Sequence, residues 1–148
     1  MSSRAKNFEH IFKEQASKLE NVLVMRLPDQ QSFLKGSYNI CDFICFRRPH
    51  FFCIELKSVQ TPSLASKLIA DTQLDGMYEA LSTRGVKAFV VIWFVGKDVT
   101  IAFPVKYLYK LFRVQGKKSV RYDDEHGIII PGKKLKKYFE YDWSPLFR

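Results

Sequence analysis

Residues 40–57 read ICDFICFRRPHFFCIELK, two apolar runs that meet across the basic, proline-containing segment 47–50. Two strand-like runs separated by a short turn segment predict a β-hairpin with residues 47–50 as its loop. This loop sets three facing pairs across the hairpin: Phe46 with Phe51, Ile44 with Cys53, and Asp42 with Glu55. The predicted register therefore places two carboxylates opposite each other.

Two facing carboxylates are unfavourable without a partner. Directly opposed residues have Cβ atoms roughly 4.5–5.5 Å apart, so Asp42 and Glu55 would repel each other unless a divalent cation lay between them. Lys57 follows Glu55 by two residues and lies on the same face. Burial of three unpartnered charges would cost several kcal/mol, which indicates a polar edge or a bound ligand. From this triplet alone, ordinary polar residues at strand ends remain the alternative.

The opposite face of the hairpin is wholly apolar and is expected to pack into a core. Its members are Cys41, Phe43, Cys45, Phe52, Ile54 and Leu56. Alternation along the strands turns Cys53 away from the other two cysteines. We expect all three to be reduced core residues, and metal binding is the less favoured interpretation.

The chain before the hairpin predicts a helix and a strand. Residues 7–20 carry apolar side chains at helical spacing and predict an amphipathic helix. Glu9 lies at the border of the apolar stripe, so it either leans toward the sheet or is solvated. Residues 21–27 predict a short strand, and residues 28–36 a polar connection.

After the hairpin, Thr61-Pro62-Ser63 is a helix-start signal, and apolar residues recur as far as Leu81. We expect a crossover helix here, either continuous or broken near Asp71. Gln73 lies on its apolar face and is expected to point at the sheet, either satisfying backbone groups or touching substrate or metal-bound water.

The next segments complete an α/β pattern. Residues 87–95 form a near-continuous apolar run, typical of a central strand covered on both faces. Residues 99–103 predict another strand, and Pro104 opens a helix. The expected fold class is α/β, with a mixed central sheet flanked by helices.

Composition restricts the class of protein. The chain has 148 residues, 47% hydrophobic and 15% aromatic, which predicts a single folded domain over residues 1–148. The net charge of +9 indicates a polyanionic partner, with nucleic acid favoured over a membrane surface. No run approaches the ~18 apolar residues of a spanning helix, and the N-terminus lacks a signal-sequence pattern. We expect a cytoplasmic protein without membrane contact.

Residues 113–148 interleave basic and aromatic side chains. They are Lys117, Lys118, Arg121, Lys133, Lys134, Lys136 and Lys137, with Tyr122, Tyr138, Phe139, Tyr141 and Trp143. Such a segment either follows phosphates and stacks on bases or is a solvated surface, and the sequence leaves both open.

Asp42 followed by Glu55-Leu56-Lys57 resembles the PD-(D/E)xK nuclease core, in which two carboxylates hold Mg²⁺ and a lysine addresses water or phosphate. Residues 36–115 further resemble the RecU-type Holliday junction resolvases of Gram-positive bacteria and their phages. The resemblance is carried by Asp42, Ile54-Glu55-Leu56-Lys57, Gln73, Gly85 before Phe89-Val90-Val91-Ile92-Trp93-Phe94, and Ala102-Phe103-Pro104.

This resemblance implies a restriction-endonuclease-like fold and a homodimer that nicks two opposing strands of four-way DNA junctions with Mg²⁺ or Mn²⁺. It implies that Asp42 and Glu55 are metal ligands, Lys57 is catalytic and Gln73 is at the active site. Glu9 matches an N-terminal helix glutamate of the family, which makes it a third candidate ligand. The chain departs from the family in having only a short segment in place of the usual long stalk before Asp42.

Two other functions compete with junction resolution. One is a less structure-selective DNA endonuclease on the same core, and the other is a DNA-binding module that has lost catalysis. The chain lacks a phosphate-binding GxxxxGK[ST] loop, a dinucleotide glycine pattern and an HExxH pair. Its three histidines, His10, His50 and His126, are too scattered to indicate a catalytic triad.

Overall fold

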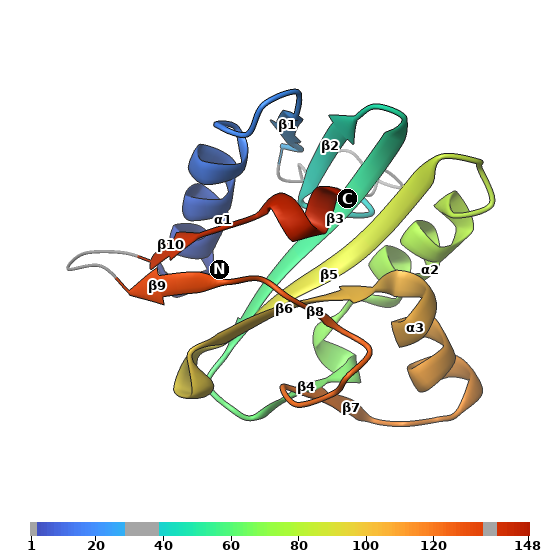
Figure 1. Ribbon diagram of the computed structural model, residues 1–148. Coiled ribbons are helices and arrows are strands. Elements are labelled where there is room, and N and C mark those ends of the chain that lie inside the picture. Colours follow the sequence, from blue (N-terminus) through green and yellow to red (C-terminus); the bar gives the residue numbers. More distant parts are fainter. Residues whose placement is uncertain (1–2, 29–38, 135–138) are drawn as a thin grey trace.

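The computed structural model describes residues 3–28, 39–134 and 139–148 (Figure 1). Within these ranges a six-stranded sheet has the order β1-β2-β3-β5-β6-β8. Its strands are β1 (Leu23–Arg26), β2 (Phe43–Arg47), β3 (His50–Val59), β5 (Val86–Phe94), β6 (Val99–Pro104) and β8 (Ile128–Ile129). β3 and β5 are parallel and the other neighbours are antiparallel, which confirms the predicted mixed sheet.

The β2–β3 hairpin has the predicted register. The confirmed pairs are Phe46 with Phe51 and Ile44 with Cys53. The loop is shorter than predicted, because Arg47 and His50 also pair and leave only Arg48–Pro49 between the strands. A loop shortened by one residue on each side keeps the same residues opposite each other.

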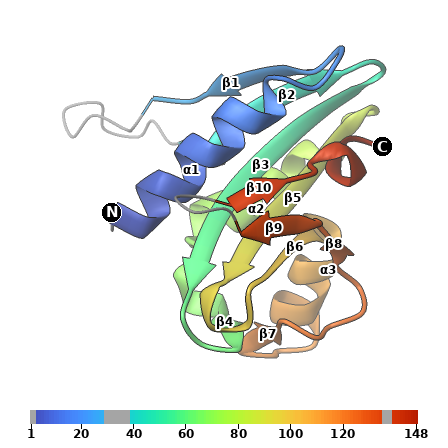
Figure 2. The same cartoon turned by 60° about the vertical axis from the view of Figure 1, so that its left-hand side comes forward.

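Helices cover both faces of the sheet (Figures 1 and 2). On one face lie α1 (Ser3–Ala16) and the C-terminal turn η4 (Ser144–Phe147). On the other lie α2 (Asp71–Ala80) and α3 (Val105–Tyr109), which continues as the π-helical turn η3 (Lys110–Val114). Alternate residues of β5 enter the apolar clusters on the two faces, which confirms a central strand covered on both sides. Among the described residues, no helix is both long enough and apolar enough to cross a membrane.

The cysteines are free and buried, but one prediction about them is wrong. Cys41 lies in the same apolar cluster as Cys53, while Cys45 lies in the cluster on the α1 side. Cys41 precedes β2 in a bend, so the alternation that holds within the strand does not apply to it.

The crossover helix begins ten residues later than the predicted start at Thr61. Residues before it form β4 (Ser63–Ala65) and the short turn η1 (Ser66–Leu68). β4 pairs with β7 (Ser119–Arg121), and Leu64 is fully buried. A strand partner more than fifty residues away therefore overrides the local helix-start signal.

The C-terminal segment packs against α1. β9 (Gly132–Lys134) pairs with β10 (Phe139–Tyr141), and Trp143 is only 1% exposed, with its ring edge-on to Phe12. Gln15 of α1 accepts a hydrogen bond from the Trp143 Nε1–H at 3.1 Å. Stacking of Trp143 on bases is thus excluded by burial. Lys136, Lys137 and Tyr138 lie outside the described residues, as does most of the connection before the hairpin.

Candidate active site

Four of the five predicted site residues gather around the second half of β3, and the fifth, Glu9, is linked to them through Arg26. β2 pairs only with residues 50–54 of β3, so on this side the rest of β3, residues 55–59, has no β2 residue paired with it. Asp42 immediately precedes β2, Glu55 and Lys57 lie on β3, Gln73 lies on α2, and Glu9 lies on α1. Elements from both faces of the sheet therefore contribute to one cluster.

Asp42 does not continue the hairpin register. The paired residues end at Phe43 and Ile54, so the predicted direct pairing of Asp42 with Glu55 across the hairpin is wrong, because the chain bends at Asp42 just before β2. The Asp42 N–H donates to the Ile54 carbonyl at 3.1 Å, and its Oδ2 accepts the Leu56 N–H at 2.9 Å. Burial raises the pKa of Asp42, while the Leu56 N–H and the positive charge of Lys57 act in the opposite direction. The carboxylate is thus fixed beside Glu55 by the free edge of β3.

Glu55 is 2% exposed and has two polar partners. Gln73 Nε2 donates to its Oε1 at 3.1 Å, and Lys57 Nζ lies 3.3 Å from its Oε2. Burial, followed by the charge of Asp42, raises the pKa of Glu55 to about 8, while Lys57 lowers it. Two adjacent carboxylates with raised pKa values form a site whose negative charge a cation would stabilise.

Arg26 joins the cluster, although no sequence pattern predicted it there. Its Nη2 and Nε lie 3.0 and 3.2 Å from Glu9 Oε2, and its Nη1 donates to the Leu27 carbonyl at 3.0 Å. The charge of Arg26 also lowers the pKa of Asp42, so Arg26 lies near this carboxylate as well as beside Glu9. The signal in the sequence was a single cation in the otherwise apolar strand 22–27.

Residues 29–139 match the family model described as Recombination protein U. The chain belongs to the Recombination protein U family. Among solved structures, an Archaeoglobus fulgidus Hjc, described as a Holliday junction resolvase from an archaeal hyperthermophile, aligns with a TM-score of 0.50 and 13% identity. The alignment covers 95% of this chain and 88% of that one. A comparison with curated proteins finds no match.

The family match confirms the resemblance to the RecU-type proteins, and the structural likeness confirms the restriction-endonuclease-like fold. The residues of this Recombination protein U family member also suit a hard divalent cation. Mg²⁺ is usually bound through one or two carboxylates and retains water or phosphate oxygens as its other ligands. Asp42 and Glu55 supply such a pair.

Glu9 has a different position from the other two acids. It is 7% exposed and held by Arg26, and its role as a third ligand stays a prediction. Within the part of the chain that the structure describes, no three or more Asp, Glu, His or Cys side chains are arranged to hold an ion by themselves. A bound ion would therefore complete its shell from water and substrate.

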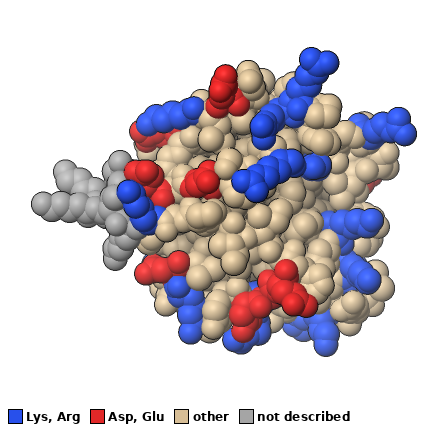
Figure 3. Space-filling view, in the orientation of Figure 1, with Lys and Arg blue, Asp and Glu red and all other residues tan. Residues whose placement is uncertain are grey.

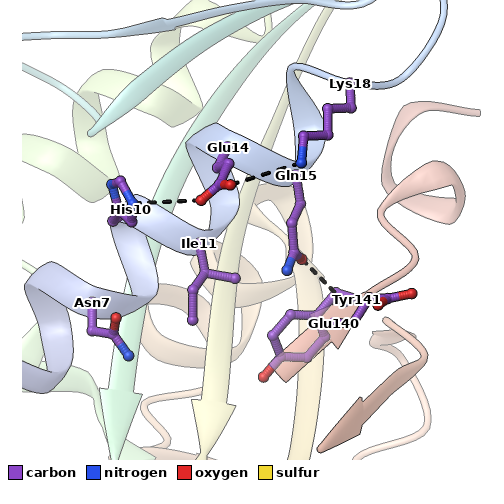
Figure 4. Close-up of a pocket in the computed structure, with 8 residues that line it drawn as sticks. All are labelled: Asn7, His10, Ile11, Glu14, Gln15, Lys18, Glu140 and Tyr141. Carbon is purple, nitrogen blue, oxygen red and sulfur yellow. Dashed lines mark hydrogen bonds and ion pairs between the residues drawn. The ribbon is translucent and has the colours of Figure 1, made fainter. Parts of the chain in front are cut away.

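A cavity of about 480 Å³ lies elsewhere, between α1 and β10 (Figure 4). It is lined by Asn7, His10, Ile11, Glu14, Gln15, Lys18, Glu140 and Tyr141. Gln15 closes one side by accepting the Tyr141 N–H at 3.0 Å. None of the five predicted site residues lines it, so the carboxylate cluster and not this cavity is the candidate active site.

Proposed function

We propose that this protein is an endonuclease that resolves four-way DNA junctions by paired nicks, with Mg²⁺ or Mn²⁺ as its cofactor. The observation that most supports this is the buried Glu55 beside the half-buried Asp42, with the Lys57 ammonium 3.3 Å from Glu55. Membership of the Recombination protein U family and the likeness to a protein described as a Holliday junction resolvase support the same substrate.

In the proposed mechanism, Asp42 and Glu55 hold the ion. When bound, Mg²⁺ supplies charge neutralisation at the scissile phosphate and lowers the pKa of a coordinated water. Gln73 holds Oε1 of Glu55 and so fixes the orientation of that carboxylate. Lys57 donates to the attacking water or to the developing charge on the phosphate. Arg26 holds Glu9 against the sheet.

The direct test compares three labelled DNAs with the wild-type protein: a four-way junction, a duplex and a single strand. In Mg²⁺ or Mn²⁺ we expect symmetric nicks in two opposing strands of the junction, and in EDTA we expect none. Equal cleavage of junction and duplex would favour the less selective endonuclease. Binding without cleavage in either metal would favour the catalytically inactive module.

We also propose that the enzyme is a homodimer, because one site per chain does not make two symmetric nicks at once. An apolar surface on β1, β2 and β3 supports this. Leu23, Met25, Phe46 and Phe51 are between 38% and 56% exposed. Phe51 shares β3 and a sheet face with Glu55, and Phe46 is its paired neighbour on β2, so a second copy docked there would bring two catalytic clusters close to one two-fold axis.

Light scattering at micromolar concentration tests this interface. We expect the wild type to have the mass of two chains and the Leu23→Ser/Phe46→Ser variant to have the mass of one. Ile129→Ser is the matched control, because Ile129 is 67% exposed but lies outside this surface. A wild type that stays monomeric on junction DNA would contradict both the dimer and resolution by paired nicks.

A further inference from the structure

Three basic side chains form a row at the carboxyl end of β3. They are Arg4 of α1, Lys97 in the turn η2 (Val95–Lys97) after β5, and Arg121 of β7. We propose that this row, which we call the basic row, binds the phosphate backbone of one duplex arm beside the cleavage site. The proposal rests on the proposed nuclease function and adds to it the surface that positions the DNA.

Gln60, the residue that follows β3, connects the first two members of the basic row. Its side-chain amide faces the Arg4 guanidinium, and it accepts hydrogen bonds from Arg4 when the amide is oriented with its oxygen toward that group. Its backbone oxygen lies 2.9 Å from the place that a Cβ would occupy at Gly96, so the two backbones approach too closely for any larger residue there. Lys97 is the residue after Gly96, so the contact of Gly96 with Gln60 places Lys97 on the same side of the molecule as Arg4.

Tyr122 connects Lys97 to Arg121. The Lys97 Nζ lies 5.0 Å and the Arg121 Cζ 5.6 Å from the centroid of its ring. These cation–aromatic contacts hold both charges in place while both residues remain exposed. Arg121 Nε also contacts Asp123 at 3.0 Å, an exposed pair of the kind that contributes little in water.

The basic row crosses the end of the sheet from one layer to the other. α1 packs on one face, whereas β7 contributes to the cluster on the opposite face, and Figures 1 and 2 both show the end of β3 beside the turn after β5. Gln60 follows Lys57 by three residues, about 10 Å along a strand. That distance corresponds to about three base pairs along a duplex.

The chemistry of the basic row suits a phosphate backbone. Its members are two guanidinium groups and an ammonium, which contact phosphates without reading bases. The exposed apolar surface lies at the other end of β3, around Phe51, so a docked second chain and a DNA arm would not compete for space.

The first test measures junction binding in EDTA at several salt concentrations. We expect the triple variant Arg4→Ala/Lys97→Ala/Arg121→Ala to bind the junction at least about tenfold more weakly than the wild type. The salt slope, which is the steepness with which the logarithm of the binding constant falls with the logarithm of the salt concentration, should decrease by about 2 to 3, the value for three lost phosphate contacts. The control Lys13→Ala/Lys106→Ala/Lys110→Ala removes the same charge from exposed positions outside the basic row. Equal weakening by both triples would show a net-charge effect and overturn the proposal.

Melting curves show whether each variant is folded. If the triple variant is unfolded, the double variant Lys97→Ala/Arg121→Ala replaces it in the binding measurements, because it leaves Arg4 on α1 intact. We expect this double variant to keep the wild-type melting temperature and to lose about two units of salt slope. An unchanged slope in a folded double variant would overturn the proposal.

The second test places neutral methylphosphonates one at a time within five nucleotides of the nick. We expect methylphosphonates about three nucleotides from the nick, on one side of it, to weaken junction binding by the wild type. The same methylphosphonates should not weaken binding further in the alanine variant that lacks the basic row. If the wild type nicks the unmodified junction but no methylphosphonate position weakens its binding, the proposed role of the basic row is contradicted and the proposed nuclease function is not. If the wild type neither nicks nor binds the junction, the proposed function itself fails.

Discussion

At the scale of single residues, Glu55 has the most restricted position in the candidate site. It is buried, its Oε1 accepts from Gln73, and its Oε2 lies beside Lys57. Both oxygens therefore have a fixed direction before any ion binds. Such partners of a ligating carboxylate orient it and tune its affinity for metal.

Gln73→Ala tests this orientation. Without its amide, Glu55 keeps its charge but loses the hydrogen bond to Oε1, so we expect the Mg²⁺ concentration for half-maximal nicking to rise by about 10- to 100-fold. Thr72→Ala, an exposed neighbour on the same helix, is the control and should leave the Mg²⁺ requirement unchanged. A lower maximal rate at an unchanged Mg²⁺ requirement would show that Gln73 acts on the substrate instead.

Residue patterns predicted most of this cluster but not Arg26. The shared face of Glu55 and Lys57 follows from alternation along β3. Asp42 lies near Glu55 as predicted, but in a bend before β2 and not in the paired part of the hairpin. The contact between Arg26 and Glu9 joins a strand to a helix on one face of the sheet. No local periodicity encodes such a contact, because it depends on how the helix lies across the sheet.

At the scale of secondary-structure elements, α2 supports the segment that carries Asp42. A Cβ at Gly76 would overlap the Ile40 side chain, two residues before Asp42. The helix thus packs directly against the chain that enters β2. The position of Asp42, the proposed metal ligand, depends on this close approach as well as on the hairpin.

Gly76→Ala is expected to disturb that support. Overpacking costs about 1–3 kcal/mol, and the better helix propensity of alanine returns about 1 kcal/mol, so the free energy of unfolding should fall by up to about 2 kcal/mol. Nicking should fall as well, because Ile40 has to move. The Gly76→Ala/Ile40→Ala double variant makes room for the methyl group and should regain activity. Full activity of the single variant would contradict the proposed support.

The elements differ in how well the sequence predicts them. The hairpin was predicted because both strands and the turn are contiguous in the chain. Residues 61–68 were wrongly assigned to a helix, since β4 exists only through its pairing with β7. Trp143 was likewise placed on the surface, although the fold buries it against Phe12. In both cases the deciding contact is distant in sequence.

At the scale of the whole molecule, β3 organises three regions in order. The exposed apolar surface lies around Phe51 at its start, the carboxylates follow at Glu55, and the basic row lies beyond Gln60. Figure 3 shows basic side chains mainly around the edge of one face, together with several smaller groups of acidic ones. The proposed self-association surface, the candidate active site and the proposed DNA-positioning surface therefore occupy successive parts of one strand.

The central claim is that Asp42 and Glu55 hold the ion that cleaves DNA, and Asp42→Asn tests it most directly. Asparagine keeps an oxygen that accepts the Leu56 N–H but removes one of two neighbouring charges. A thermal melt in EDTA is paired with junction binding in EDTA and nicking in Mg²⁺. We predict no nicking, junction binding as tight as wild type or tighter, and an equal or higher melting temperature, because like-charge repulsion is relieved. A clear loss of stability with nicking retained would contradict the metal site.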